Sequence, residues 1–254
     1  MSFETDKQTL DDLNILGKYK NDSVYSIFGG IVTRGGERML ENMFTHPLKD
    51  AEAINRRVSI FRYFKDCKLK FPGTPEEYDI VEQYIGGASG KHWIFNLMLL
   101  GQMKFMEIIG HDPRYKLWQE QVRATILFLE KAKQYLRELV KGMSGNPLLL
   151  DNKLLNHLLE HGDRKLSMDK MFQFDRLLRC QLNKELLKLL NLFHELDLCT
   201  VVGRIASERN FCFPVACREN EISMKLVGVR HPAIMGAISN DMEITKSKNI
   251  FFLT

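Results

Sequence analysis

The sequence predicts a mainly α-helical protein that ends in a few β-strands, and three observations support this fold class. Apolar residues recur at helical spacing through the first two thirds of the 254-residue chain, as they do in amphipathic helices. Residues that cap helices, and glycines that end them, fall where such helices should begin and end. After Asn210 the apolar residues alternate with polar ones, which is typical of strands.

The first elements in chain order are short and have clear start signals. Gly35-Gly36 predicts a turn that a side chain would hinder. Asp50 is expected to cap a helix whose apolar face is Ile54, Val58, Phe61 and Phe64. The next helix should begin at Thr74-Pro75-Glu76-Glu77, where the threonine caps, the proline fits the first helical position and the last glutamate completes a capping box. It should end at Gly86-Gly87.

Three longer helices are expected in the middle of the chain. They run from about Trp93 to Ile109, from about Tyr115 to Lys141 and from about Ser167 to Leu196. The last two would each span roughly 40 Å. Their apolar stripes are Val122, Ile126, Leu129, Leu136 and Val140 in the first of these two, and Phe174, Leu178, Leu182, Leu186, Leu189 and Phe193 in the second. A break from Gly142 to Pro147 and a short helical run ending at Gly162 separate them, so an arm of antiparallel helices is expected.

The carboxyl-terminal part should contain strands. Ile222–Val227 alternates with period two, and Ile250–Leu253 is a continuous apolar run. Such a run is normally buried on both faces of a sheet by further chain, so we expect the chain to be truncated within a second domain. The expected domains are residues 1–210, which are helical, and residues 211–254, which begin a sheet.

The composition is that of a globular protein and does not by itself select a function. The chain is 44% hydrophobic and has a formal net charge of +4, far from the strongly basic balance of a dedicated nucleic-acid module. Its five cysteines are scattered without a C-x-x-C pair, so neither a metal site nor a disulfide is expected. No window resembles a membrane helix or a signal peptide, which indicates a cytoplasmic protein with no membrane partner.

A pattern of small, basic and apolar residues lies between Asp11 and Phe64. Its positions are Thr33, Gly36, Arg38, Leu40, Pro47, Leu48, Asp50, Ile54 and Arg57. They resemble the core of the MutS family of DNA mismatch repair ATPases, in which L-D-x-T-x-T-x-x-G-x-R-L-L leads to P-L-x-D-x-x-x-I-x-x-R. The resemblance implies a MutS core and lever domain with long antiparallel helices. Arg38 and Arg57 are interpreted as scaffold or surface arginines, with phosphate contact as the alternative.

A second stretch resembles the entry to the MutS ATPase domain. It consists of Arg230-His231-Pro232, Ser239-Asn240-Asp241 and the run from Ile250 to Thr254. In the family, a G-R-H-P turn and an F-x-x-N-D segment precede the strand that leads to the phosphate-binding loop, which cradles phosphates and holds magnesium. The resemblance implies a parent ATPase that uses ATP and Mg²⁺. This chain ends before the loop, so by itself it is expected to have no catalytic residue, to hold no cofactor and to hydrolyse no nucleotide.

Ile238 and Asn240 are candidates for the adenine side of a nucleotide pocket in the complete protein. They match the family's segment, although the aromatic residue that stacks on the base is replaced by Ala237. An ordinary connection between strands is the alternative. His231 is interpreted as a turn residue whose ring is satisfied by backbone, because no nucleophile is near it in the sequence.

The family's usual DNA contacts are not expected in this chain. Phe105-Met106-Glu107 has the spacing of the mismatch-wedging residues, but it lies in an apolar helix and is interpreted as core packing. Only residues 142–166 stand where the family inserts its β-rich clamp. The candidate DNA-binding residues are therefore basic side chains of the two long helices and their connection, namely Lys131, Lys133, Arg137, Lys141, Arg164, Lys165 and Lys170. A solvated helix face interleaved with Glu130 and Glu138 is the alternative.

Two classes of function stay open at this point. The first is the core and lever region of a MutS-like ATPase that acts as a homodimer on mismatched or branched DNA. The second is a non-enzymatic helical scaffold that binds protein partners, which the short connection at residues 142–166 favours. An independent enzyme has no support, because the sequence has no paired carboxylates, metal-ligand spacing or nucleophile motif.

Overall fold

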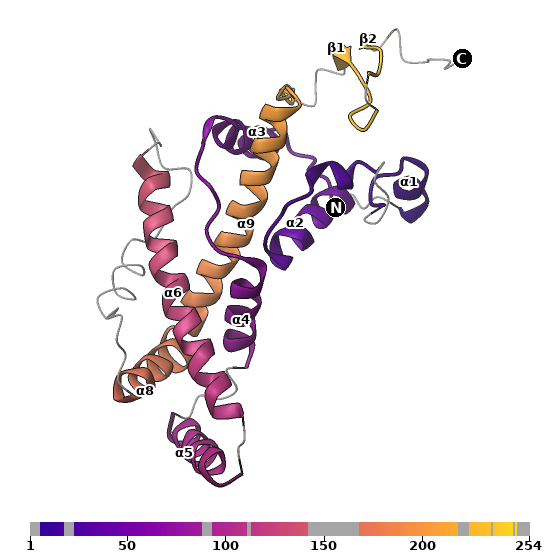
Figure 1. Ribbon diagram of the computed structural model, residues 1–254. Coiled ribbons are helices and arrows are strands. Elements are labelled where there is room, and N and C mark those ends of the chain that lie inside the picture. The colour runs from indigo at the N-terminus through magenta and orange to yellow at the C-terminus, as the bar shows by residue number, and fades with distance from the viewer. Residues whose placement is uncertain are drawn as a thin grey trace. The chain divides into compact units, whose positions relative to one another are not determined.

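The computed structural model describes residues 6–17, 23–87, 93–110, 113–141, 168–217, 224–234, 236–245 and 247. Over these residues the protein is mainly helical, as predicted (Figure 1). In chain order the elements are α1 (Lys7–Asp12), η1 (Tyr25–Phe28), α2 (Arg34–Thr45), α3 (Ala51–Asp66), α4 (Pro75–Gly86), α5 (Trp93–Gly110), α6 (Arg114–Lys141), α8 (Met168–Arg176), η2 (Leu177–Gln181), α9 (Asn183–Glu208), β1 (Met224–Val229) and β2 (Asn240–Ile244).

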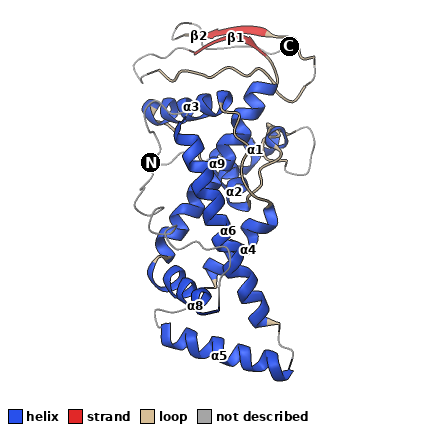
Figure 2. Ribbon diagram, turned by 60° about the vertical axis from the view of Figure 1, so that its left-hand side comes forward, coloured by secondary structure: helices blue, strands red, loops and turns tan. Residues whose placement is uncertain are grey.

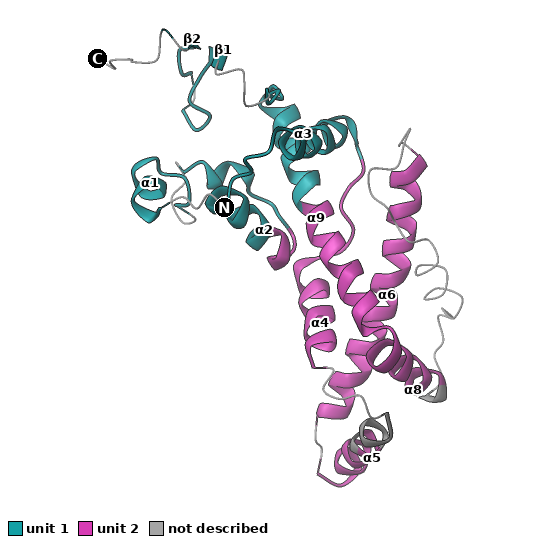
Figure 3. Cartoon of the chain, turned by 180° about the vertical axis from the view of Figure 1, so that it is seen from behind, with its two compact units in different colours: residues 1–31, 37–68, 198–254 teal, residues 32–36, 69–197 magenta. Residues whose placement is uncertain are grey.

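The chain forms two compact units, which Figure 3 colours separately. Unit 1 consists of residues 1–31, 37–68 and 198–254, and unit 2 consists of residues 32–36 and 69–197. The division falls within α9, between Asp197 and Leu198. The change of domain expected at residue 210 stays a prediction.

The core of unit 1 is built around η1 and the end of α9. Ile27, Val201 and Ile205 are buried together, and Phe28, Ile31, Phe211 and Ala233 pack against them. The predicted cap of α3 is confirmed, because the Asp50 carboxylate accepts a hydrogen bond from the Ala53 N–H at 2.7 Å. Where α9 meets α3, a methyl group at Gly203 would overlap the backbone of Phe64. This close approach requires glycine.

The two described strands form an antiparallel pair, drawn in red in Figure 2. Met224 pairs with Ile244 and Leu226 with Met242, and the register shifts before Val229. The strand predicted over residues 222–227 is therefore confirmed from Met224 onward. Residues 218–223 and the apolar run 250–253 lie outside the described residues.

Unit 2 has a core of aromatic rings from α4, α6, α9 and the segment before α4. Phe193 is fully buried, and its ring centroid lies 5.4 Å from that of Phe128, 5.9 Å from that of Tyr135 and 6.1 Å from that of Phe71. Tyr78 stacks on Phe71 at 5.5 Å. Each such contact contributes about 0.5–1.5 kcal/mol beyond the burial of apolar area. The rings thus hold α4, α6 and α9 together within this unit.

The bounds of α4, α5 and α6 agree with the predicted helices to within one residue. Thr74 and Glu77 form the expected capping box. The predicted stripe of α6 is buried at Val122, Ile126, Leu129 and Leu136. Val140 is an exception at 40% exposure, because Leu139 takes the buried position one turn after Leu136.

The prediction of one continuous helix from Ser167 to Leu196 is wrong. The N–H of Leu182 donates to the carbonyl of Leu177, five residues earlier, at 2.9 Å, and this wide turn separates α8 from α9. Helix α9 also continues to Glu208, because buried apolar side chains persist past residue 196. The break at residues 142–147 and the helical run that follows it lie outside the described residues.

Gly35 and Gly36 do not form the predicted turn, since both lie in the first turn of α2. Thr33 caps this helix, its Oγ1 accepting from the Gly36 N–H at 3.0 Å. The buried Asp197 carboxylate accepts from the Thr33 N–H at 2.7 Å. A methyl group at Gly35 would overlap the ring of His194. Glycine is needed here for close packing against α9, which the local sequence does not reveal.

The interpretation of Phe105 and Met106 as core residues is also wrong. Their exposed fractions are 59% and 41%. Helix α5 buries Leu100 instead and leaves much of its apolar surface uncovered, including Ile108 and Ile109 at 70% and 66% exposure. The apolar side chains of a helix are buried only on the faces that another element covers.

Candidate functional site

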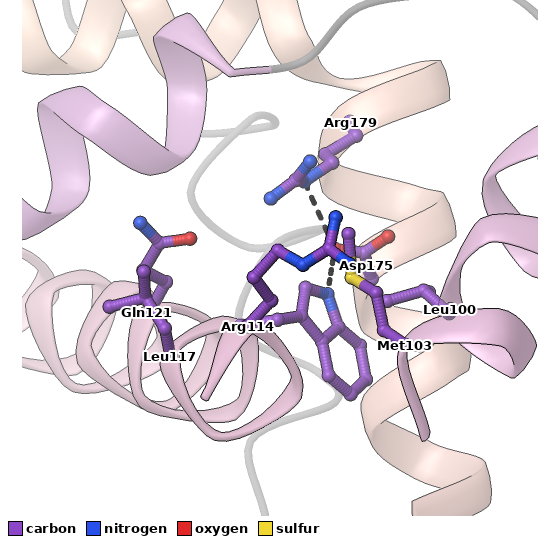
Figure 4. A pocket seen from close by; sticks show the side chains of 8 residues that line it. Leu100, Met103, Arg114, Leu117, Gln121, Asp175 and Arg179 are labelled. Atoms are coloured by element: carbon purple, nitrogen blue, oxygen red, sulfur yellow. Dashed lines mark hydrogen bonds and ion pairs between the residues drawn. The ribbon is translucent and has the colours of Figure 1, made fainter. Parts of the chain in front are cut away.

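A pocket in unit 2 lies among α5, α6, α8 and η2, and we call it the Arg179 pocket. Its volume is about 190 Å³. It is lined by Leu100 and Met103 of α5, by Arg114, Leu117, Trp118 and Gln121 of α6, by Asp175 of α8 and by Arg179 of η2 (Figure 4). Apolar walls with a few polar groups are typical of small-molecule sites.

Asp175 is the hydrogen-bonding centre of this pocket. It is 4% exposed, and its Oδ1 accepts from the Tyr84 hydroxyl at 3.0 Å and from the Trp118 indole N–H at 2.8 Å. The same oxygen lies 3.0 Å from Nε of Arg179. Two hydrogen bonds and one ion pair, from three helical elements, therefore stabilise one buried negative charge, as a buried charge requires.

Arg179 is held in place by several contacts. Its guanidinium carbon lies 4.3 Å from the centre of the Tyr84 ring, which is a favourable cation–π arrangement. Its Nη1 donates to the Gly87 carbonyl at 3.5 Å. The wide turn η2 presents Arg179 one helical turn after Asp175. The guanidinium is thus pre-positioned at the pocket wall.

The environment also determines the protonation of Tyr84. Burial raises the pKa of the Tyr84 hydroxyl well above its ordinary value, and the negative charge of Asp175 raises it further, while the positive charge of Arg179 opposes these effects. Tyr84 is therefore neutral at neutral pH. In that form its hydroxyl donates a hydrogen bond to Asp175.

The residues of the pocket suit binding better than catalysis. No hydroxyl or thiol lines the pocket beside a base, which nucleophilic catalysis requires. Within the ranges that the structure describes, no group of three or more His, Cys, Asp or Glu side chains could hold a metal ion. The pocket is lined by two guanidinium groups, a carboxylate, an amide and apolar walls, which are groups that serve recognition.

The structure places the candidate DNA-binding residues in different surroundings. Lys131 donates to both carboxylate oxygens of Glu77 at 2.7 Å, so its charge is neutralised within unit 2. Lys133 is half-buried, whereas Arg137 and Lys141 are exposed on the same helix. Lys170 is exposed on α8, and residues 164 and 165 lie outside the described residues.

Of the candidate nucleotide residues, Ile238 lies just before β2 and Asn240 begins it. Ile238 is 84% exposed, and the side-chain amide of the exposed Asn240 donates to the Ile238 carbonyl at 3.5 Å. Nδ1 of His231 accepts from the Ala233 N–H at 3.3 Å. The interpretation of His231 as a turn residue bonded to backbone is thereby confirmed.

Sequence reasoning did not find the Arg179 pocket. One signal was present, because Asp175 directly follows Phe174 of the predicted stripe and has an arginine four residues later. A carboxylate beside the apolar face of a helix is seldom buried without a partner. The partners Tyr84 and Trp118 come from other helices, and no local pattern links them.

Comparison of the sequence with protein-family models and with curated proteins finds no match. None of the helices in the described ranges is both long and apolar enough to cross a membrane.

Proposed function

We propose that this chain is the helical core and lever region of a MutS-like DNA repair ATPase. In the complete protein, ATP and Mg²⁺ bound by an ATPase domain would control how a homodimer binds mismatched or branched DNA. Ile238 and Asn240 would then lie on the adenine side of the nucleotide pocket. The resemblance of two sequence stretches to that family supports this proposal.

The order of elements around Arg230-His231-Pro232 is the observation that supports the proposal most. Strand β1 ends at Val229, this turn follows, and Asn240-Asp241 begins β2. The Arg209 guanidinium donates to the Pro232 carbonyl at 2.9 Å, which ties the turn to the end of α9. The MutS family has an Arg-His-Pro turn and then an Asn-Asp pair in the same order before its phosphate-binding loop, although this chain has Val229 and Ala237 where the family has glycine and an aromatic residue.

A basic stripe on α6 is the surface that we assign to DNA. Lys133, Arg137 and Lys141 are spaced by four residues, so they lie on one side of the helix. Phosphate binding without sequence preference requires little more than such a row of positive charges. Lys131 is excluded from the stripe because Glu77 neutralises it.

Fluorescence anisotropy with labelled DNA tests this function. The ligands are homoduplex, mismatched duplex and four-way junction at two salt concentrations, and the proteins are this chain and a longer form extended through a phosphate-binding loop and ATPase domain. Salt-sensitive binding by the longer form that changes with ATP is the expected result. Absence of binding by both forms would contradict the DNA-acting function.

Substitutions in the basic stripe locate the contact. Arg137→Gln and Lys141→Gln should each reduce the dependence of log K on log salt concentration by about 1, as the loss of one phosphate contact does. The matched control is Lys184→Gln, which removes an exposed charge from α9. Equal effects of all three changes would show that net charge alone, and not the stripe, determines binding.

A second candidate function is a scaffold that binds protein partners through α5. The observation that favours it is the exposed apolar surface of this helix, where Met98, Phe105, Ile108 and Ile109 are between 59% and 71% exposed. Surfaces of this kind often mark interaction sites. A photo-crosslinker at position 105, compared with one at exposed position 123 of α6, tests it. Protein crosslinks from position 105 that Ile109→Lys abolishes would support the scaffold, and equal crosslinking from both positions would contradict it.

A further inference from the structure

We propose that α3 carries a binding site for an extended peptide segment, and that the chain's own residues 211–217 occupy this site as a releasable strap. The site consists of Asn55, Arg62 and Lys65, and we call it the strap site. Both the site and the strap belong to unit 1. The proposal is independent of DNA binding and of the resemblance to MutS proteins.

Asn55 recognises the backbone of the strap. Its Nδ2 donates to the Ala216 carbonyl at 2.9 Å, and its Oδ1 accepts from the Ala216 N–H at 2.9 Å. One side-chain amide therefore satisfies both backbone groups of one residue, as the opposite residue of a neighbouring strand does in a sheet. This pairing requires an extended segment but no particular side chain at that position.

Arg62 and Lys65 recognise an aromatic side chain of the strap. The guanidinium carbon of Arg62 lies 5.5 Å from the centre of the Phe213 ring, and Nζ of Lys65 lies 5.7 Å from it. Both distances are within the range of cation–π attraction. Asn55, Arg62 and Lys65 follow one another at spacings of seven and three residues, so they lie on one face of α3. The site thus selects an aromatic residue three positions before the paired backbone.

The strap is held by few contacts, which makes it releasable. None of residues 211–217 is fully buried, and Val215 is 74% exposed. Segments with few buried apolar contacts open locally at low cost. Phe211 packs against the core of unit 1, so the strap stays anchored at this end when the remainder opens. Opening uncovers the strap site for another extended segment.

Hydrogen exchange of the Ala216 amide measures this opening in the full chain. Val215-Ala216 is the only Val-Ala pair in the sequence, so ¹³C-carbonyl valine and ¹⁵N alanine give an NMR signal for this amide alone. We expect exchange at least about tenfold slower than in a free peptide of residues 210–217, because the docked strap is held by hydrogen bonds. Urea below the unfolding transition should hardly change the rate, since local opening exposes little surface.

The amide of the buried residue Val201 on α9 is the reference. Thr200-Val201 is the only Thr-Val pair in the sequence, so the same labelling strategy isolates it. Its exchange should accelerate with urea, because it requires the core of unit 1 to open. Equal urea dependence at Ala216 and Val201 would show that the strap is part of the cooperative core and would overturn its release.

One pair of variants locates the contact that holds the strap. Asn55→Ala should raise the exchange rate of Ala216 at least about tenfold, since two hydrogen bonds are lost. The matched control is Asn42→Ala, which changes an exposed asparagine on α2 of the same unit and should leave the rate unchanged. Far-ultraviolet circular dichroism checks that both variants are folded.

A peptide supplied in trans tests whether the strap site is a binding site. The probe is a fluorescein-labelled peptide of residues 210–217 with serine in place of both cysteines, and fluorescence anisotropy measures its binding. The full chain with Phe213→Ala and Ala216→Pro has a weakened strap but an intact strap site, and it should bind the probe saturably. Adding Asn55→Ala should weaken this binding at least about tenfold. The unaltered chain should bind it more weakly than the first variant, because its own strap competes at high effective concentration.

Each of three outcomes would overturn the proposal. The first is exchange of Ala216 in the unaltered chain as fast as in the free peptide. The second is equal acceleration by Asn55→Ala and Asn42→Ala. The third is absence of peptide binding by the variant with the weakened strap.

Discussion

Replacing Asp175 by asparagine would remove the negative charge at the centre of the Arg179 pocket while keeping the size of the side chain. The carbonyl oxygen of the amide would still accept from Tyr84 and Trp118, which now bond to Oδ1 of the carboxylate. Arg179 would lose its ionic partner, which lies 3.0 Å away. The change therefore isolates the ion pair from the two neutral hydrogen bonds.

The expected cost follows from the burial of the pair. The side chains of Arg179 and Asp175 are 18% and 6% exposed, so water screens their interaction poorly. Removing one partner of a buried pair destabilises proteins by about 3–5 kcal/mol. Because Arg179 keeps its contact with the Tyr84 ring, we expect Asp175→Asn to lower the free energy of unfolding by about 3 kcal/mol. Tyr84→Phe, which removes one neutral hydrogen bond, should lower it by about 1 kcal/mol.

Urea denaturation measures these losses, with tryptophan fluorescence and circular dichroism as two probes whose agreement tests for a single transition. A double-mutant cycle adds Arg179→Met. If the charges are coupled as described, the double variant should lose less stability than the sum of the two single variants by at least about 1 kcal/mol. The reasoning is refuted if Asp175→Asn costs no more than Tyr84→Phe, or if the two changes at the ion pair are additive.

Three other predictions concern packing, pH and capping. Gly203→Ala should lower the free energy of unfolding by at least about 1–3 kcal/mol because a methyl group there overlaps the backbone of α3, whereas Gly101→Ala, beside open space, should raise it by about 0.5–1 kcal/mol in the same urea titration. The pKa of Tyr84 is higher in the folded chain than its ordinary value of 10.0, so the unfolded chain releases this proton at a lower pH than the folded chain does. The free energy of unfolding should therefore fall as the pH rises above about 10. The same pH series with Tyr84→Phe should show a shallower fall. Thr74→Ala removes the cap of α4 and should cost about 1 kcal/mol by thermal denaturation, while Thr45→Ala at the exposed end of α2 should cost less than about 0.5 kcal/mol; equal costs would contradict the role of the cap.

The candidate site illustrates how far local patterns reach. The basic residues of α6 were found from their helical spacing, because neighbours on a helix surface follow from the sequence alone. The ion pair that neutralises Lys131 was not predicted, since its partner Glu77 lies 54 positions away in the sequence. Glu77 was correctly placed in a capping box, and its second role depends on how α4 packs against α6. A local motif therefore identified the residue but not all of its partners.

The sequence by itself determined the main helices, the caps at Asp50 and Thr74 and the start of a carboxyl-terminal sheet. These features depend on contacts within a few positions along the chain, so periodicity and capping residues suffice to find them. The tertiary structure decided which apolar faces are covered, why Gly35 must be glycine and how the Arg179 pocket forms. Those outcomes join distant residues, such as Tyr84 and Asp175, which are 91 positions apart. Such contacts form only when the helices pack together, because a hydrogen bond requires that the donor and the acceptor lie within about 3 Å of each other. The sequence around each residue does not show which distant residue will lie there.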